Sequence, residues 1–179
     1  IPAVVLGACA AELSPVLTRL YQASYRTGIV PESWREANLQ PIPKKGNRSH
    51  PTNYRPITIS VMCKVMEWTI NAQLIHYLEN HSLTSDRQYG LRQNRSTGDL
   101  LAFVLHRWGE AIDRHGEALA VSLDIAKAFD RVWHRGLLSK LPAYGLPGNL
   151  CTWISGFLHG RRMRVVVDGH ASALMSVNA

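Results

Sequence analysis

The sequence predicts a mixed α+β fold, and three features carry that prediction. Apolar residues recur at helical spacing over residues 61–78 and again over 100–112, which is typical of amphipathic helices. The apolar run 118–123 has the length and composition of a buried strand. Asp168-Gly169 separates two further extended stretches and is a common hairpin turn. Helices followed by a strand, a helix and a hairpin indicate an α+β chain.

The first 34 residues are expected to form a short helix, a second helix and a turn. Residues 3–11 are apolar enough for a short helix. Ser14-Pro15 suits an N-cap followed by proline at the first helical position, and Gly28 suits the end of that helix. A single turn around Trp34 should then place its indole in the core.

A basic hairpin is expected next. Residues 39–43 and 54–59 are extended in pattern, because Pro56 disfavours helical geometry at the residue before it. The connecting residues 44–51 are polar and basic and contain no hydrophobic anchor. On composition alone this tip is an exposed, solvated loop.

The second half of the chain contains clear helix boundaries. Ser96 and Asp99 have the spacing of a capping box, and Gly116 should end the helix that they begin. Short helices are expected over residues 135–141 and 148–158. The apolar side chains of the 97–115 helix should form a core stripe: Leu100, Leu101, Val104, Leu105, Trp108 and Ile112.

Composition limits the kinds of partner. The 179 residues carry a net charge of +7, which favours a polyanionic partner such as nucleic acid, with a simply solvated basic surface as the alternative. The three cysteines, Cys9, Cys63 and Cys151, form no C-x-x-C pair, so neither a zinc site nor a disulfide scaffold is expected. No P-loop or serine-histidine-aspartate arrangement is present.

Two carboxylates follow the predicted strand. Asp124 stands at its end and Asp130 lies where the chain should turn into a helix. An acid at a strand end needs a cation or hydrogen-bond donors, because burying a bare charge is costly. A divalent metal that handles phosphates is one explanation for Asp124. A helix cap is the other, and on spacing alone it is the commoner one.

The residues around Asp124 carry a resemblance to a known family. The segment LDIAKAFDRVWH, residues 123–134, resembles motif A of the reverse transcriptases of non-LTR, LINE-type and especially jockey-like retrotransposons. The resemblance implies the fingers of a right-hand polymerase over residues 1–117. It implies the first, incomplete part of a ferredoxin-like palm over residues 118–179.

The same resemblance assigns roles near motif A. Asp124 matches the family's catalytic, metal-binding acid, and the Ile125 carbonyl is a second expected metal ligand. The implied cofactor is Mg²⁺, with two ions in the complete enzyme and Mn²⁺ as a substitute. Phe129 matches the aromatic residue that rejects a ribose 2′-hydroxyl, with core packing as the alternative. Asp130 is expected to be structural, through a cap or a salt bridge to a neighbouring arginine.

Two more segments resemble the family's fingers. IPKKG followed by NYRPI is similar to the fingers hairpin, which implies that Lys44 and Arg55 hold the nucleotide triphosphate. The second, DRQYGLR with a following RST, is similar to a family segment beside template and nucleotide, and Leu91 replaces the usual Phe there. That match places five residues in the template or nucleotide vicinity: Gln88, Tyr89, Gly90, Arg92 and Arg95.

The expected function is RNA-templated DNA synthesis from a primer 3′ end. The expected partners are an RNA template, a DNA primer and deoxynucleoside triphosphates, with no membrane and no other small ligand. The family's second aspartate pair does not occur in the sequence, so the chain alone is expected to be inactive. Two alternatives stay open: a non-catalytic nucleic-acid-binding remnant, and an intron-maturase-like polymerase. An intracellular location, cytoplasmic and nuclear, is expected.

Overall fold

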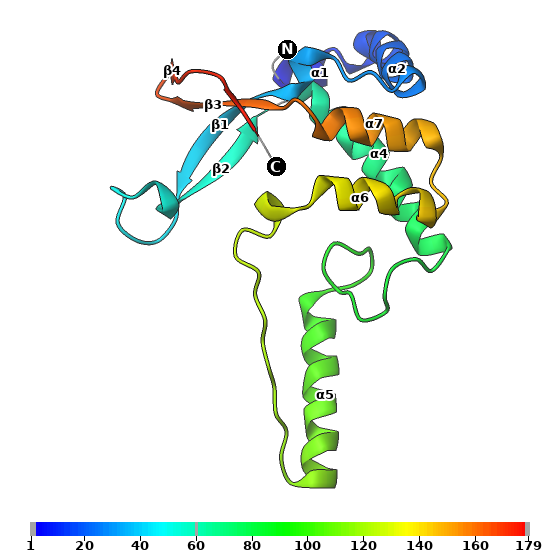
Figure 1. Cartoon of the computed structure of the whole chain (residues 1–179), viewed down its shortest axis with the longest axis vertical. Helices are drawn as coiled ribbons and strands as arrows, with labels where there is room; N and C mark the ends of the chain where they lie inside the picture. The colour runs from blue at the N-terminus through cyan, green and yellow to red at the C-terminus, as the bar shows by residue number, and fades with distance from the viewer. Residues whose placement is uncertain (1–2, 60, 178–179) are drawn as a thin grey trace. The chain divides into compact units, whose positions relative to one another are not determined.

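The computed structural model describes residues 3–59 and 61–177, and it confirms the mixed α+β class (Figure 1). The chain forms two compact units. The first contains the residues up to Thr69 and those from Phe129 onward, and the second is Ile70–Ala128. The boundary between fingers and palm at residue 117 stays a prediction.

The chain begins with two helices, α1 (Ala3–Ala8) and α2 (Ala10–Thr27). The expected cap at Ser14 is wrong. The Leu13 N–H already donates to the Cys9 carbonyl at 2.9 Å, so Ser14 and Pro15 lie inside α2. Gly28 ends α2 as expected, with a left-handed φ of 69°.

Helix α2 packs closely against α7 (Gly148–Leu158) in the first unit. The Trp153 indole N–H donates to the Ser24 hydroxyl at 3.0 Å, and that hydroxyl donates to the Ile29 carbonyl at 2.7 Å. Both side chains are buried, so the hydrogen bonds satisfy polar groups that burial would otherwise penalise. The short helix α3 (Glu32–Arg35) places Trp34 in the same core, as expected.

The sheet is organised around β1 (Glu36–Pro43). Strand β2 (Tyr54–Ile59) pairs with it in antiparallel fashion after the 3-10 turn η1 (Pro51–Asn53), which confirms the predicted hairpin. On its other side β1 pairs in parallel with β3 (Arg162–Val167), a contact that no sequence pattern indicated.

Prolines in β1 explain why its parallel pairing with β3 stops at Leu39. The Lys44 N–H donates to the Asn53 carbonyl at 2.7 Å, so alternation places Pro41 and Pro43 where an N–H would point away from β2. That outward edge is the one β3 approaches, and proline offers it no donor. The parallel pairing accordingly ends at Leu39 opposite Val165.

A second hairpin follows β3. Strands β4 (His170–Ala171) and β5 (Met175–Ser176) both pair with β3 in antiparallel fashion. Asp168 and Gly169 have φ values of 49° and 81°, the left-handed pair that a tight hairpin turn requires. The predicted turn is confirmed, although the returning strand is split in two.

The remaining helices are α4 (Val61–Asn80), α5 (Thr97–His115) and α6 (His134–Lys140), with the 3-10 turns η2 (Phe129–Arg131) and η3 (Pro142–Tyr144). The Ser96–Asp99 capping box of α5 is present in both directions. Helix α4 ends when the Leu83 N–H donates to the Leu78 carbonyl, with Ser82 in a left-handed conformation. Among residues 3–59 and 61–177, no helix is both long and apolar enough to cross a membrane.

The predicted strand over residues 118–123 is wrong. These residues are extended, but they form no ladder and belong to no described strand. Leu119, Val121 and Leu123 are exposed, Leu123 by 89%. A strand needs a hydrogen-bonding neighbour, and the part of the chain that the structure describes pairs none with this segment.

The apolar stripe of α5 was expected to be buried, and this is also wrong. Leu101, Leu105, Trp108 and Ile112 are all exposed. Helical periodicity reports that one face is apolar, whereas its burial needs a surface to cover it. Within the second unit no described element covers this face.

We predict that Gly28→Ala destabilises the first unit by more than a left-handed alanine alone would. A Cβ at Gly28 would lie 2.5 Å from the Thr152 Cγ2, well inside contact distance. Gly169→Ala is the control, because Gly169 has a similar positive φ and a Cβ added there would meet nothing within 4 Å. We expect about 1 kcal/mol for the control and about 1–3 kcal/mol more for Gly28→Ala, measured by urea unfolding.

The double variant Gly28→Ala/Thr152→Ala separates the two causes. Removing the Thr152 methyl should restore most of the additional loss. Equal destabilisation by Gly28→Ala and Gly169→Ala would contradict the close packing of α2 on α7.

Candidate functional site

The tip of the β1–β2 hairpin is a cationic surface in the first unit. Ile42 lies directly opposite Arg55, so their side chains share one face of the hairpin. Lys44 follows Ile42 by two residues and its N–H continues the ladder, which places it on the Arg55 face. Lys45 lies in the bend that follows, beyond the last ladder hydrogen bond. Only Lys44 of the two lysines therefore continues the ladder beside Arg55, and its role as a nucleotide contact stays a prediction.

The tip between the strands is ordered by side chains. The Asn53 amide donates to the Asn47 carbonyl at 2.7 Å, and the Tyr54 hydroxyl donates to the Arg48 carbonyl at 3.0 Å. The Lys44 ammonium donates weakly to the Thr52 carbonyl at 3.4 Å. Residues 40–59 contain no acidic side chain, so these cations are available to an anion.

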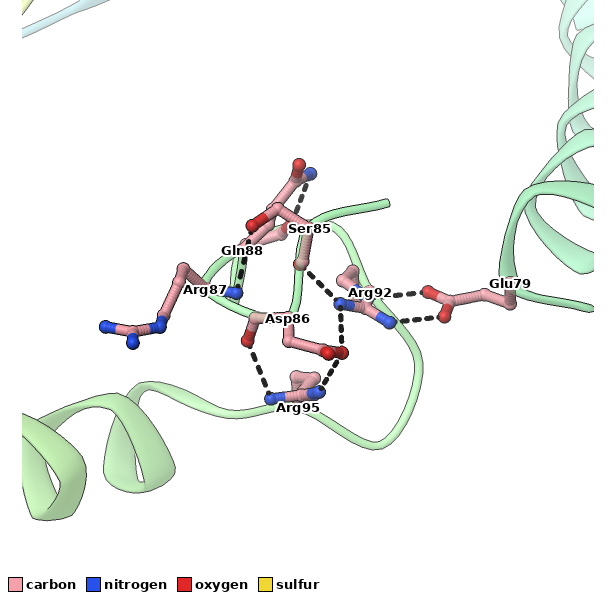
Figure 2. Close-up of polar contacts among 8 residues, drawn as sticks. Glu79, Ser85, Asp86, Arg87, Gln88, Arg92 and Arg95 are labelled. Atoms are coloured by element: carbon pink, nitrogen blue, oxygen red, sulfur yellow. Dashed lines mark hydrogen bonds and ion pairs between the residues drawn. The ribbon is translucent and has the colours of Figure 1, made fainter. Parts of the chain in front are cut away.

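The residues predicted in the template or nucleotide vicinity lie in one loop of the second unit, residues 81–96 (Figure 2). The Arg92 guanidinium donates two parallel hydrogen bonds, of 2.7 and 2.5 Å, to the carboxylate of Glu79 at the end of α4. Its third nitrogen donates to the Ser85 carbonyl at 2.7 Å. All three guanidinium nitrogens of Arg92 therefore donate hydrogen bonds within the chain.

A second arginine closes the same loop. Arg95 donates to the Asp86 carbonyl at 3.2 Å and lies 3.5 Å from the Asp86 carboxylate. Its guanidinium also lies over the Tyr89 ring, 5.3 Å from the centroid, and Tyr89 lies 6.3 Å from the Phe103 ring of α5. The loop is thus attached to both helices that flank it.

The exposed part of the loop presents amides and one apolar side chain. Gln88 and Gly90 are exposed, and the Gln88 amide donates to the Gly90 carbonyl at 3.2 Å. Leu91, which replaces the family's usual Phe, is 83% exposed and has a positive φ of 62°. Glu79 and the pairing of Asp86 were not predicted from the sequence, because an ion pair between residues as far apart as Glu79 and Arg92, thirteen positions, leaves no periodic signal.

Hydrogen bonding shifts the titration of the Glu79 carboxyl. The Arg92 hydrogen bond is the largest cause that lowers the Glu79 pKa, and burial partly opposes it. Glu79 raises the pKa of Arg92 for the same reason. Both groups stay charged at neutral pH.

Asp124 and Ile125 lie in the extended segment of the second unit, and both are exposed. Phe129 lies in η2 of the first unit and is 85% exposed, so it does not pack in the core. Asp130 is exposed in the same turn, and in the described chain no ion pair joins it to Arg131 or Arg135.

The oxygen atoms of the Asp124 carboxylate and the Ile125 carbonyl could form part of a magnesium site. A carboxylate and a carbonyl oxygen are hard ligands, the kind that Mg²⁺ prefers. Across the described residues, however, no group of three or more His, Cys, Asp or Glu side chains gathers closely enough to hold a metal ion. Asp124 and Ile125 can therefore supply only a fraction of the roughly six ligands that such an ion takes.

Comparison with known proteins identifies the family. Residues 42–177 match the family described as Reverse transcriptase (RNA-dependent DNA polymerase). The chain is 32% identical over 159 residues to the probable RNA-directed DNA polymerase from transposon BS of Drosophila melanogaster, covering 84% of this chain and 17% of the relative. It is 31% identical over 167 residues to the polymerase from mobile element jockey of the same organism, covering 91% and 18%.

The chain belongs to the reverse transcriptase family. The similarity to polymerases of jockey and related elements confirms the non-LTR resemblance found in motif A. The chain spans less than a fifth of the length of these relatives.

We predict that the Glu79 carboxyl titrates below the usual glutamate range and returns to it in Arg92→Gln. Because its folded-state pKa is lowered, the pair stabilises the loop above about pH 4.3, the unfolded value, and this contribution is lost as pH falls through the lowered pKa. Carboxyl carbon NMR shifts followed from about pH 6 to about pH 2 measure the midpoint directly. An unchanged midpoint in Arg92→Gln would contradict the paired geometry.

Proposed function

We propose that the chain forms the fingers and the first part of the palm of a non-LTR retrotransposon reverse transcriptase. The parent enzyme would extend a primer 3′ end with deoxynucleotides on an RNA template. Membership of the family supports the reaction type. The observation that carries the proposal is the shared face of Lys44 and Arg55 in a hairpin segment, residues 40–59, that contains no acidic side chain.

In this proposal the hairpin binds the triphosphate of the incoming nucleotide. Arg55 makes no ion pair with a described acid, so its planar fork is free to bind phosphate oxygens at two points. Lys44 adds a compact point charge on the same face. Neutralising the triphosphate favours binding and offsets charge that develops during transfer.

Asp124 is the proposed catalytic acid, and with the Ile125 carbonyl it would hold part of a Mg²⁺ site. The ion, when bound, supplies charge stabilisation for the transferring phosphoryl group. Phe129 is the proposed steric gate against the ribose 2′-hydroxyl. Its exposure supports this role over core packing, because the ring is free to form a pocket wall.

We predict that Lys44→Ala raises the nucleotide KM by about tenfold, an effect consistent with losing one charge-assisted contact. Lys45→Ala removes the same charge from the adjacent residue, which lies in the bend beyond the ladder, and it should change the KM by less than about threefold. Steady-state extension by a full-length polymerase carrying this chain, at fixed primer-template, gives both values. Equal effects from the two lysines would show that the hairpin contributes only general positive charge.

We expect Asp124→Asn to reduce primer extension at least about a hundredfold, because a neutral amide holds a metal ion poorly. Asp130→Asn makes the same chemical change in the following turn and should cost much less. Extension assays in Mg²⁺ and in Mn²⁺ compare the two variants, with circular dichroism as the check on folding. Near-normal extension by Asp124→Asn would refute the assignment.

A further inference from the structure

The loop of residues 81–96 is held closed by two pairs of charged side chains. Glu79 neutralises Arg92, whose side chain is only 10% exposed, and Asp86 pairs with Arg95. Arg87 has no acidic partner among the described residues, and its guanidinium lies over the Phe103 ring at 5.2 Å. The surface that remains is cationic and rich in amides: Arg87, Gln88, Gln93 and Asn94.

We propose that Glu79 is a positioning residue for the RNA template, acting through Arg92 to hold this loop in its binding conformation. This inference rests on the proposed function, because it takes the template as the loop's ligand. A cation with exposed amides suits a single strand, whose phosphates need positive charge and whose unpaired bases offer hydrogen-bonding edges. Glu79 itself would touch no nucleic acid.

The geometry explains why one carboxylate can control the loop. Glu79 stands in the last turn of α4, where the helix fixes its backbone. Arg92 joins it to the far side of the loop and, through the Ser85 carbonyl, to the near side. Three backbone positions separated in sequence are therefore tied at one guanidinium. A loop that is ordered before binding loses less conformational entropy when the template arrives.

Electrostatics and positioning predict opposite results when Glu79 is neutralised. Glu79→Gln makes the net charge more positive, and by charge alone a polyanion should bind more tightly. Loss of the bidentate pair should instead release Arg92 and the loop, and so weaken template binding. The sign of the change in affinity thus distinguishes the two effects.

Glu110→Gln is the matched control. Glu110 lies on α5, in the same unit, and also pairs with arginines, Arg107 at 2.8 Å and Arg114 at 3.7 Å. Those partners are exposed neighbours on one helix and close no loop. The control therefore makes the same chemical change and the same change in net charge.

The experiment measures the Kd of a full-length polymerase carrying this chain for a primer with an RNA template overhang, together with the nucleotide KM. We expect Glu79→Gln to weaken template binding about tenfold, with the nucleotide KM within about twofold of wild type. Glu110→Gln should bind as wild type or more tightly. Arg92→Lys keeps the charge but cannot form the bidentate pair, so its Kd should lie between those of wild type and Glu79→Gln.

Gln88→Ala separates failure of this inference from failure of the proposed template contact. If Gln88→Ala binds template as wild type does, the loop is not a template surface. If Gln88→Ala weakens binding while Glu79→Gln matches Glu110→Gln, the loop binds template but Glu79 does not position it. A parallel rise in Kd and nucleotide KM, with a lower melting temperature in Glu79→Gln, would show a general folding defect and overturn the positioning role.

Discussion

Strand β1 is the constraint on which the first unit depends, because it pairs along both edges. Its pairing with β2 fixes the hairpin that carries Lys44 and Arg55, and its pairing with β3 joins that hairpin to residues 126 positions later. Arg162 on β3 strengthens this junction by bonding to both Glu32 and Glu36. The α2–α7 packing, with its buried Ser24–Trp153 hydrogen bond, belongs to the same unit. The cationic tip of the β1–β2 hairpin is thus polar and exposed, whereas strand pairing on both edges of β1 holds its base in place.

The second unit is organised by a different kind of interaction. Its loop is held by charged pairs and hydrogen bonds, whereas much of its apolar surface lies open. The α5 stripe and the residues from Leu119 to Leu123 are exposed together. Apolar surface on this scale usually belongs to an interface. The second unit therefore combines an ordered loop with an apolar surface that no described element covers.

Local signals in the sequence were sufficient to predict most helix ends and turns, but not which distant strands and side chains pair with each other. The Ser96–Asp99 capping box, the Gly28 helix end and the Asp168-Gly169 turn each need only a few adjacent residues, and all three are present. The β1–β3 pairing and the Glu79–Arg92 pair depend on distant partners, which no periodicity reports. The strand predicted at 118–123 is wrong for the same reason, since its composition suits a strand but none of the described strands pairs with it. Resemblance, not spacing, supplied the roles of Asp124 and Phe129.

The adjacent lysines at the hairpin tip give this surface a tolerance to the loss of one residue before Lys44. Register in an antiparallel pair decides which face each side chain occupies, so a one-residue slip normally exchanges the two faces. Deleting Pro43 would bring Lys45 to the place opposite Asn53, where Lys44 now continues the ladder. The Arg55 face would then lose one lysine and gain the other. Length changes between Gly46 and Thr52 would leave the register untouched and cost little closure entropy. A sequence that loses a residue before Lys44, or changes in length beyond Gly46, can therefore keep a cation beside Arg55.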